Sequence, residues 1–184
     1  MHSNSSLLSE VKEISKGHIH HDWLICAIIS LLEKNEQLVR RLFETKTYMA
    51  EGVYRISLYV QGRWQMITID DYFPCLPQGQ PFFATIAGSK SIWLNLLEKA
   101  FAKVFGGYKY LEGGSSYEAL RMLTGAPLTS FCFNDTSVQE LIDNQSMTLL
   151  IKDFLGKRSF VLVASTQPGG PFVKDKQPLN AMEH

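Results

Sequence analysis

The chain has 184 residues, of which 45% are hydrophobic and 20% charged, so it is long enough for one globular domain and the start of a second. Eighteen basic residues balance eighteen acidic ones, which argues against a nucleic-acid or anionic-membrane partner and favours protein or peptide partners. Three scattered cysteines do not make a disulfide framework and favour a reducing compartment.

The N-terminal stretch is polar and predicts an irregular or weakly helical extension over residues 1–15. Met1 to Glu13 lacks the basic start and apolar core of a signal peptide. The longest apolar stretch, Leu24 to Leu32, is about half the length that a bilayer span requires. We therefore expect a cytoplasmic domain without a transmembrane segment, and the sequence leaves the oligomeric state open.

A buried helix is expected to start near Asp22, because the residues that follow are apolar on nearly every side. Glu33 to Phe43 is amphipathic and predicts a second helix on the surface. Val53 to Val60 then alternates apolar and polar residues, and Trp64 to Ile69 returns after a Gln-Gly turn. This pattern predicts a β-hairpin, ended by a proline-containing loop.

Helices are predicted over most of the remaining chain. Apolar residues recur at helical spacing from Ser91 to Phe105. Capping-box patterns then predict two further helix starts, at Ser115 with Glu118 and at Ser137 with Glu140. A last helix covers 147–155, and the apolar run Phe160 to Ala164 is typical of a buried strand.

The expected fold class is α+β and mostly helical, with one hairpin. Residues 16–157 form the main unit, and 158–184 begin a second subdomain or a linker tail. The predicted strand at 160–164 has no obvious partner in this chain, which indicates a second subdomain that begins here and is not finished.

Three segments carry a family likeness. The run Asp22-Trp23-Leu24-Ile25-Cys26-Ala27-Ile28-Ile29-Ser30-Leu31 resembles the calpain active-site helix, whose pattern is Cys-Trp-Leu-Leu-Ala-Ala-Ile-Ala-Ser-Leu. Gly52 to Pro74 is similar to the family's hairpin, and Trp93 to Lys103 resembles its Trp-x-x-Leu-Leu-Glu-Lys-Ala-Tyr-Ala-Lys helix. The resemblance covers roughly 13 to 165 and implies the left-hand subdomain of a papain-like cysteine protease, with a buried central helix, packed helices and a hairpin.

This subdomain of the family carries the nucleophile, whereas the histidine and asparagine would mostly lie beyond residue 184. The nucleophile position is Asp22 in this chain, where a cysteine is expected. A carboxylate is a poor nucleophile toward an amide, and no second acid suggests an aspartic-protease pair. Asp22 is alternatively a good residue for a helix start, through capping and the helix dipole.

The oxyanion-donating glutamine of the family lies six residues before the cysteine, which corresponds to Lys16, with Gly17 keeping the family's glycine. Loss of an oxyanion donor typically costs about a hundredfold in rate. The resemblance also implies a calcium site with acidic ligands at positions 13 and 91. Glu13 is still acidic, but Ser91 lacks the carboxylate that a hard cation prefers. Calcium is therefore the only cofactor that the resemblance implies, and the sequence does not predict that the chain binds it.

Two other groups of residues are candidates for chemistry. Cys26, one turn after Asp22, is interpreted as a small buried hydrophobe rather than a substitute nucleophile. His18, His20, His21 and Asp22 could bind zinc or nickel, but adjacent loop residues seldom converge on one ion, so a solvated loop is favoured. His184 is assigned no role.

Three functional readings follow. In the leading reading the chain is a calpain-like domain without peptidase activity that acts in protein binding or regulation. The alternative is a fragment of an active calcium-dependent cysteine endopeptidase whose nucleophile was substituted and whose His/Asn half is missing. A metal-binding module built on the histidine run is the third.

Overall fold

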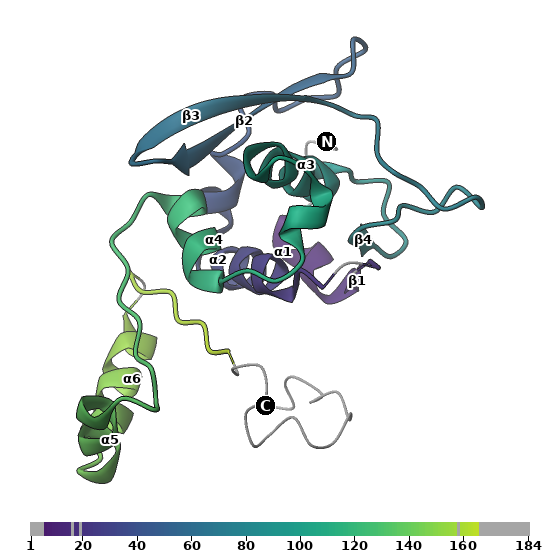
Figure 1. Ribbon diagram of the computed structural model, residues 1–184. Helices are drawn as coiled ribbons and strands as arrows, with labels where there is room; N and C mark the ends of the chain where they lie inside the picture. The colour runs from purple at the N-terminus through teal and green to yellow at the C-terminus, as the bar shows by residue number, and fades with distance from the viewer. Residues whose placement is uncertain (1–5, 16, 19, 158, 166–184) are drawn as a thin grey trace.

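The computed structural model describes residues 6–15, 17–18, 20–157 and 159–165. Its elements, in chain order, are α1 Leu7–Glu10, η1 Val11–Glu13, β1 Ile14–Ser15, α2 Asp22–Arg40, β2 Val53–Val60, β3 Arg63–Asp70, β4 Thr85–Ile86, α3 Trp93–Phe105, η2 Tyr108–Leu111, α4 Ser116–Thr124, α5 Thr136–Asp143 and α6 Ser146–Gly156 (Figure 1). The α+β class with a buried central helix, packed helices and a hairpin is confirmed.

Helix α2 runs through the centre of the main body because its apolar residues are buried. Leu24, Ala27, Ile28 and Leu31 are inaccessible to solvent and lie in one core with residues of α3, α4 and the hairpin. Asn35 has non-helical backbone angles (φ −163°, ψ 103°), so the segment is two helices joined at a kink. The helix after this kink corresponds to the second, surface helix that the amphipathic pattern predicts.

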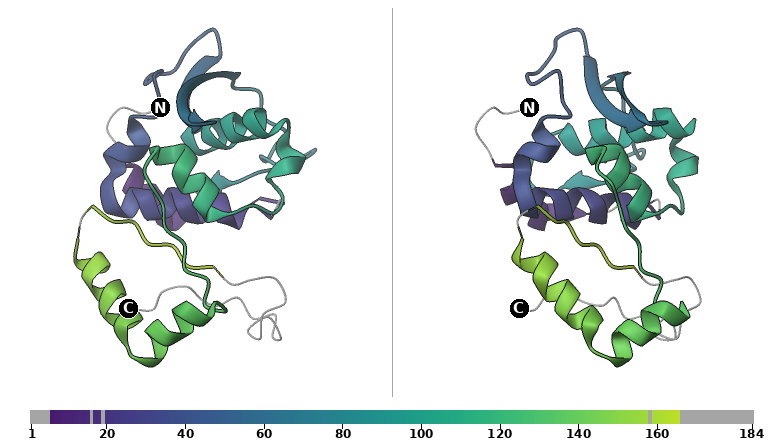
Figure 2. Two further views of the ribbon diagram at one scale, coloured as in Figure 1. Left: turned by 60° about the vertical axis from the view of Figure 1, so that its left-hand side comes forward. Right: turned by 90° about the vertical axis from the view of Figure 1, so that its left-hand side faces the viewer.

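The β2–β3 hairpin is antiparallel and lies across α3, as Figures 1 and 2 show. Its inward-facing residues Tyr54, Ile56 and Leu58 are fully buried, which is the alternation seen in the sequence. Two lysines of α3 bind to strand β3. Lys99 Nζ lies 2.5 Å from Asp70 Oδ1, and Lys103 Nζ donates to Thr68 O at 2.6 Å. The hydrogen bond from Lys99 lowers the pKa of Asp70.

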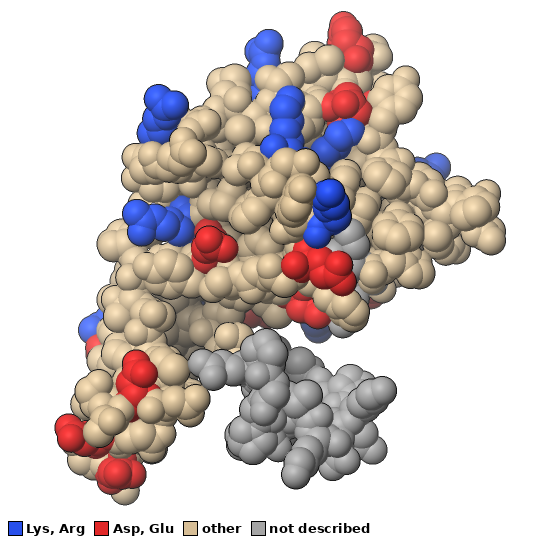
Figure 3. Space-filling view, in the orientation of Figure 1, with Lys and Arg blue, Asp and Glu red and all other residues tan. Residues whose placement is uncertain are grey.

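Helices α5 and α6 form an arm that projects from the main body (Figure 2). Lys34 joins it to α2 by donating to the carbonyl oxygens of Leu155 (3.5 Å) and Lys157 (3.3 Å). On the face shown in Figure 3, acidic side chains gather on the arm, whereas lysines and arginines are spread over the main body. The apolar residue Leu149 on this arm is 66% exposed.

Two predicted features of the C-terminal part are wrong. Residues 160–164 do not form a strand, because no other described segment pairs with them; Val161 and Val163 instead pack against the core. Helix α5 starts one residue before Ser137, with Asp135 at its N-cap, so Ser137 is inside the helix. The capping box predicted at Ser115 is present in part: the Ser115 hydroxyl accepts a hydrogen bond from the amide of Tyr117 at 3.2 Å.

The N-terminal segment is packed on α2 through Glu36. Burial would raise the pKa of this carboxyl, but hydrogen bonds from the Ser6 hydroxyl, from Arg40 and from backbone amides of Leu7 and Leu8 outweigh it and lower the pKa from 4.5 to about 2. Leu7 is buried beside this contact. Glu36 therefore joins residues 6–8 to the core while it is ionised.

We expect this contact to make stability depend on acid pH. Because the folded-state pKa of Glu36 is lowered, its contribution is complete above about pH 4.5 and is lost as the pH falls toward about 2. Urea unfolding at a series of pH values should show this loss in the wild type and a smaller one in Glu36→Gln. Equal acid dependence of the two proteins would contradict the assignment.

Candidate active site at the start of helix α2

Asp22 is the first residue of α2, as the sequence predicts, and its side chain is exposed. The turn is closed by backbone bonds from the amides of Leu24 (3.0 Å) and Ile25 (3.3 Å) to the carbonyl oxygen of His21. A negative charge at this end of a helix is stabilised by the helix dipole. The same dipole would lower the pKa of a thiol at this position, so the helix offers the electrostatics for nucleophile activation with a carboxylate in place.

One edge of the site is residues 111–116, from the end of η2 to the start of α4. The indole Nε1 of Trp23 donates to Leu111 O at 2.9 Å, and the Ser116 hydroxyl donates to Trp23 O at 3.0 Å. A Cβ on Gly114 would lie 2.4 Å from Trp23 Cε2, so only glycine permits this approach. These contacts hold the 111–116 segment against the start of α2.

A second edge is formed by residues 17–18 and 82–83. The amide of His18 donates to Phe82 O at 3.0 Å, and the two rings lie 5.0 Å apart. Gly17 touches the same backbone, because a Cβ there would lie 2.4 Å from Phe82 O. Lys16, the predicted oxyanion position, lies outside the described residues, so its role stays a prediction.

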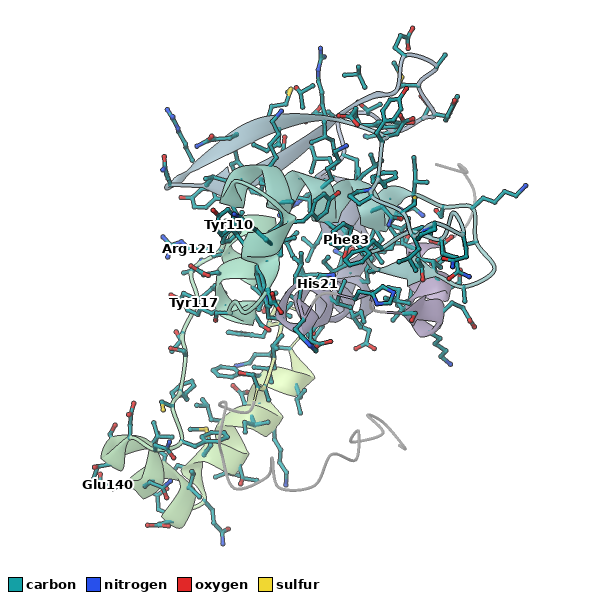
Figure 4. All side chains as sticks on the ribbon, turned by 45° about the vertical axis from the view of Figure 1, so that its right-hand side comes forward. His21, Phe83, Tyr110, Tyr117, Arg121 and Glu140 are labelled. Atoms are coloured by element: carbon teal, nitrogen blue, oxygen red, sulfur yellow. The ribbon has the colours of Figure 1, made fainter. Side chains whose placement is uncertain are left out.

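His21 is buried, which corrects the prediction that the whole histidine run is a solvated loop. His21 is 1% exposed, and its Nε2 pairs with Oε1 of Glu98 in α3, 77 residues away in the chain. His18 and His20 are exposed, as predicted. Figure 4 shows His21 inside the main body near Phe83, while Tyr117 lies at the surface.

Glu98 joins α3 to His21, just before α2, and to Ala84, next to the 82–83 edge. It is fully buried, and Oε1 also accepts from the amide of Ala84 at 3.3 Å. Asn95, one turn earlier on α3, donates to Ala84 O at 2.8 Å. Among the described residues the second oxygen, Oε2, has no hydrogen-bond partner. Burial, together with the negative charges of Glu98 and Asp70, raises the pKa of Tyr108.

The role of this carboxylate was not predicted, although the sequence carries a signal for it. Glu98 interrupts the apolar face of α3, three residues before Phe101 and five after Trp93, where a hydrophobic residue is expected. A charged residue in that position is almost never fully buried unless it is paired. Its partner could not be named from spacing alone, because His21 is distant in the chain.

Cys26 is exposed on α2, so the interpretation as a buried hydrophobe is wrong about its environment. The side of α2 that carries Cys26 faces away from the core. The backbone carbonyl of Cys26 accepts a hydrogen bond from the Ser30 hydroxyl at 2.8 Å. Cys75 in the proline-containing loop is also exposed.

The histidine run does not assemble a metal site within the described part of the chain. No group of three or more His, Cys, Asp or Glu side chains converges there. The imidazole of His21 is turned to Glu98, away from the exposed neighbours His18 and His20.

The residues implied as calcium ligands do not fit a calcium ion either. Glu13 is exposed and contributes its backbone carbonyl to the amide of Ala87 at 2.8 Å, and Ser91 offers only a hydroxyl. A neighbouring carboxylate, that of Glu10, accepts one hydrogen bond on each oxygen, from the Ser89 hydroxyl and from the Trp93 indole. A hard cation prefers several carboxylate and carbonyl oxygens, which this donor set does not supply.

Comparison with known proteins agrees with this geometry. A family model described as calpain family cysteine protease matches residues 2–169. The chain therefore belongs to the calpain family of cysteine proteases.

Individual relatives show how much of a longer protein the match covers. The chain is 32% identical to the calpain-type cysteine protease DEK1 of Arabidopsis thaliana over 158 residues, which is 86% of this chain and 7% of that protein. It is 35% identical to DEK1 of Zea mays over 113 residues, 61% of this chain and 5% of that protein. Calpain-10 of Mus musculus is 31% identical over 130 residues, 68% and 19% respectively. The chain thus spans less than a fifth of these relatives.

No helix in the described part of the chain is both long enough and apolar enough to cross a membrane.

Proposed function

We propose that this chain is a calpain-family protease subdomain that does not cleave peptide bonds and acts instead in protein or peptide binding. The observation that carries the proposal is the carboxylate of Asp22 at the start of α2, where the family resemblance puts a cysteine nucleophile. Lys16 at the predicted oxyanion position adds to it, since two catalytic positions differ together. The edges at 111–116 and 82–83 would be kept for binding.

The chemistry of residue 22 supports this reading. An ionised carboxylate at a helix N-terminus is stabilised by the dipole, and stabilisation of the charged form makes it a weaker nucleophile. Acid proteases use two facing carboxylates around a water, whereas Asp22 stands beside the buried pair of His21 and Glu98, which is directed into the core. Asp22 would then act as a helix-start residue.

Cleavage of casein tests the proposal. We expect no calcium-dependent cleavage by the wild type, and no difference between the wild type and Asp22→Ala. Titration calorimetry with unfolded casein should show binding without cleavage. Cleavage that requires calcium, and that is blocked by a thiol alkylator and by Cys26→Ser, would contradict the proposal and assign the chemistry to Cys26.

The alternative function, a fragment of an active calcium-dependent cysteine endopeptidase, is supported by the short share of its relatives that the chain spans and by the exposed apolar residues of the α5–α6 arm. The parent reading frame separates the two proposals. A cysteine codon at position 22, with a histidine and an asparagine downstream, would favour the enzyme. An altered second half would favour the binding domain.

A cytoplasmic location is part of the same proposal. It is supported by the sequence, in which three scattered cysteines do not make a disulfide framework. Fluorescence microscopy of the tagged protein would test the location.

A further inference from the structure

The N-terminal segment is joined to the start of α3 by one carboxylate, that of Glu10. Its Oε2 accepts from the indole Nε1 of Trp93 at 2.7 Å, and its Oε1 accepts from the Ser89 hydroxyl at 3.0 Å. The Ser89 oxygen in turn accepts from the amide of Ser91 at 3.1 Å. The carboxylate thus satisfies a fully buried indole and orders the loop before α3.

The surrounding backbone shows what this bridge holds in place. Strand β1 pairs with β4 through Ile14 with Ile86 and Ser15 with Thr85, and the amide of Ala87 donates to Glu13 O at 2.8 Å. Such a two-residue pairing is weak by itself. Glu10 lies before β1 in the chain and adds a second connection between the two segments. Residues 17–18, which lie after β1, form part of an edge of the candidate site.

The resemblance implies that a calcium ion would join the N-terminal segment, through Glu13, to the start of α3, through Ser91. Those residues do not fit calcium, because Glu13 is the only carboxylate of the pair and Ser91 offers only a hydroxyl. Glu10 connects the same two segments with hydrogen bonds alone.

We propose that Glu10 is a metal-free tether, so that assembly of this edge of the domain is independent of calcium. The inference goes beyond the proposed function and does not depend on whether the chain cleaves or binds peptides. It follows from the hydrogen bonds that both oxygens of Glu10 accept and from the poor donor set at Glu13 and Ser91. Hydrogen bonds to a charged acceptor are among the stronger ones in proteins.

Thermal unfolding of the protein in millimolar calcium and in excess chelator is the first test. We expect the same melting temperature in both solutions. A rise in the melting temperature with calcium that disappears in Glu13→Gln would overturn the inference, because it would show that Glu13 ligates the ion.

Substitution of Glu10 is the second test. Glu10→Ala should lower the melting temperature by roughly 3 to 8 °C in both solutions, and Glu10→Gln, which keeps one acceptor, by less. Hydrogen exchange of the amides in 14–15 and 85–87 should become faster in both variants. Glu33→Ala, at an exposed position on α2, is the matched control and should change neither measurement.

The outcome is decisive in either direction. If Glu10→Ala matches Glu33→Ala in melting temperature and in local exchange, the tether is wrong. If Glu10→Ala does not fold, the local exchange of Glu10→Gln decides instead: unchanged exchange overturns the tether, and faster exchange supports it.

Discussion

Replacing Glu98 with alanine is expected to lower the free energy of unfolding by about 3 to 5 kcal/mol, the loss typical when one partner of a buried ionisable pair is removed. The carboxylate is fully buried and accepts from the imidazole of His21 and from the amide of Ala84. Without it, both donors stay in the core and lose this acceptor. Urea unfolding of Glu98→Ala measures the loss.

A matched control and a double-mutant cycle make this prediction specific. Glu140→Ala removes an exposed carboxylate on α5 (Figure 4) and should change stability by less than about 0.5 kcal/mol. If His21 and Glu98 act as a pair, the double variant His21→Ala/Glu98→Ala should cost clearly less than the sum of the single variants. Additive losses would show that the two side chains contribute independently.

The second large effect is expected for Gly17→Ala. The new Cβ would lie 2.4 Å from Phe82 O and from the carbonyl carbon of Phe83, and backbone atoms cannot rotate away as a side chain can. We expect a loss of about 3 kcal/mol, at the upper end of the cost of overpacking, with the edge of the site displaced. Thermal or urea unfolding of the variant measures it.

Gly156→Ala is the control for this substitution. Nothing lies within 4 Å of a Cβ at position 156, and alanine is the better helix former, so stability should stay equal or rise slightly. Equal stability of Gly17→Ala and the wild type would mean that residues 17–18 do not approach 82–83 as closely as described.

The local elements could be predicted because their signals are local. The hairpin follows from strict alternation in 53–60, and the end of α3 from glycine at 106, which adopts φ 92°. The strand expected at 160–164 failed for the opposite reason. An apolar run does not make a strand without a partner to receive its backbone hydrogen bonds, and the described chain supplies none.

The candidate site also has one part that local sequence predicts and another that depends on tertiary packing. The sequence by itself determined that a helix begins at Asp22 and that a carboxylate stands at its N-terminus, because helix starts depend on residues within one turn. Only the tertiary structure decided that His21 is buried against Glu98 and that Glu10 reaches Trp93. Those contacts join residues 77 and 83 positions apart, and burial of polar groups at such distances depends on how whole elements pack.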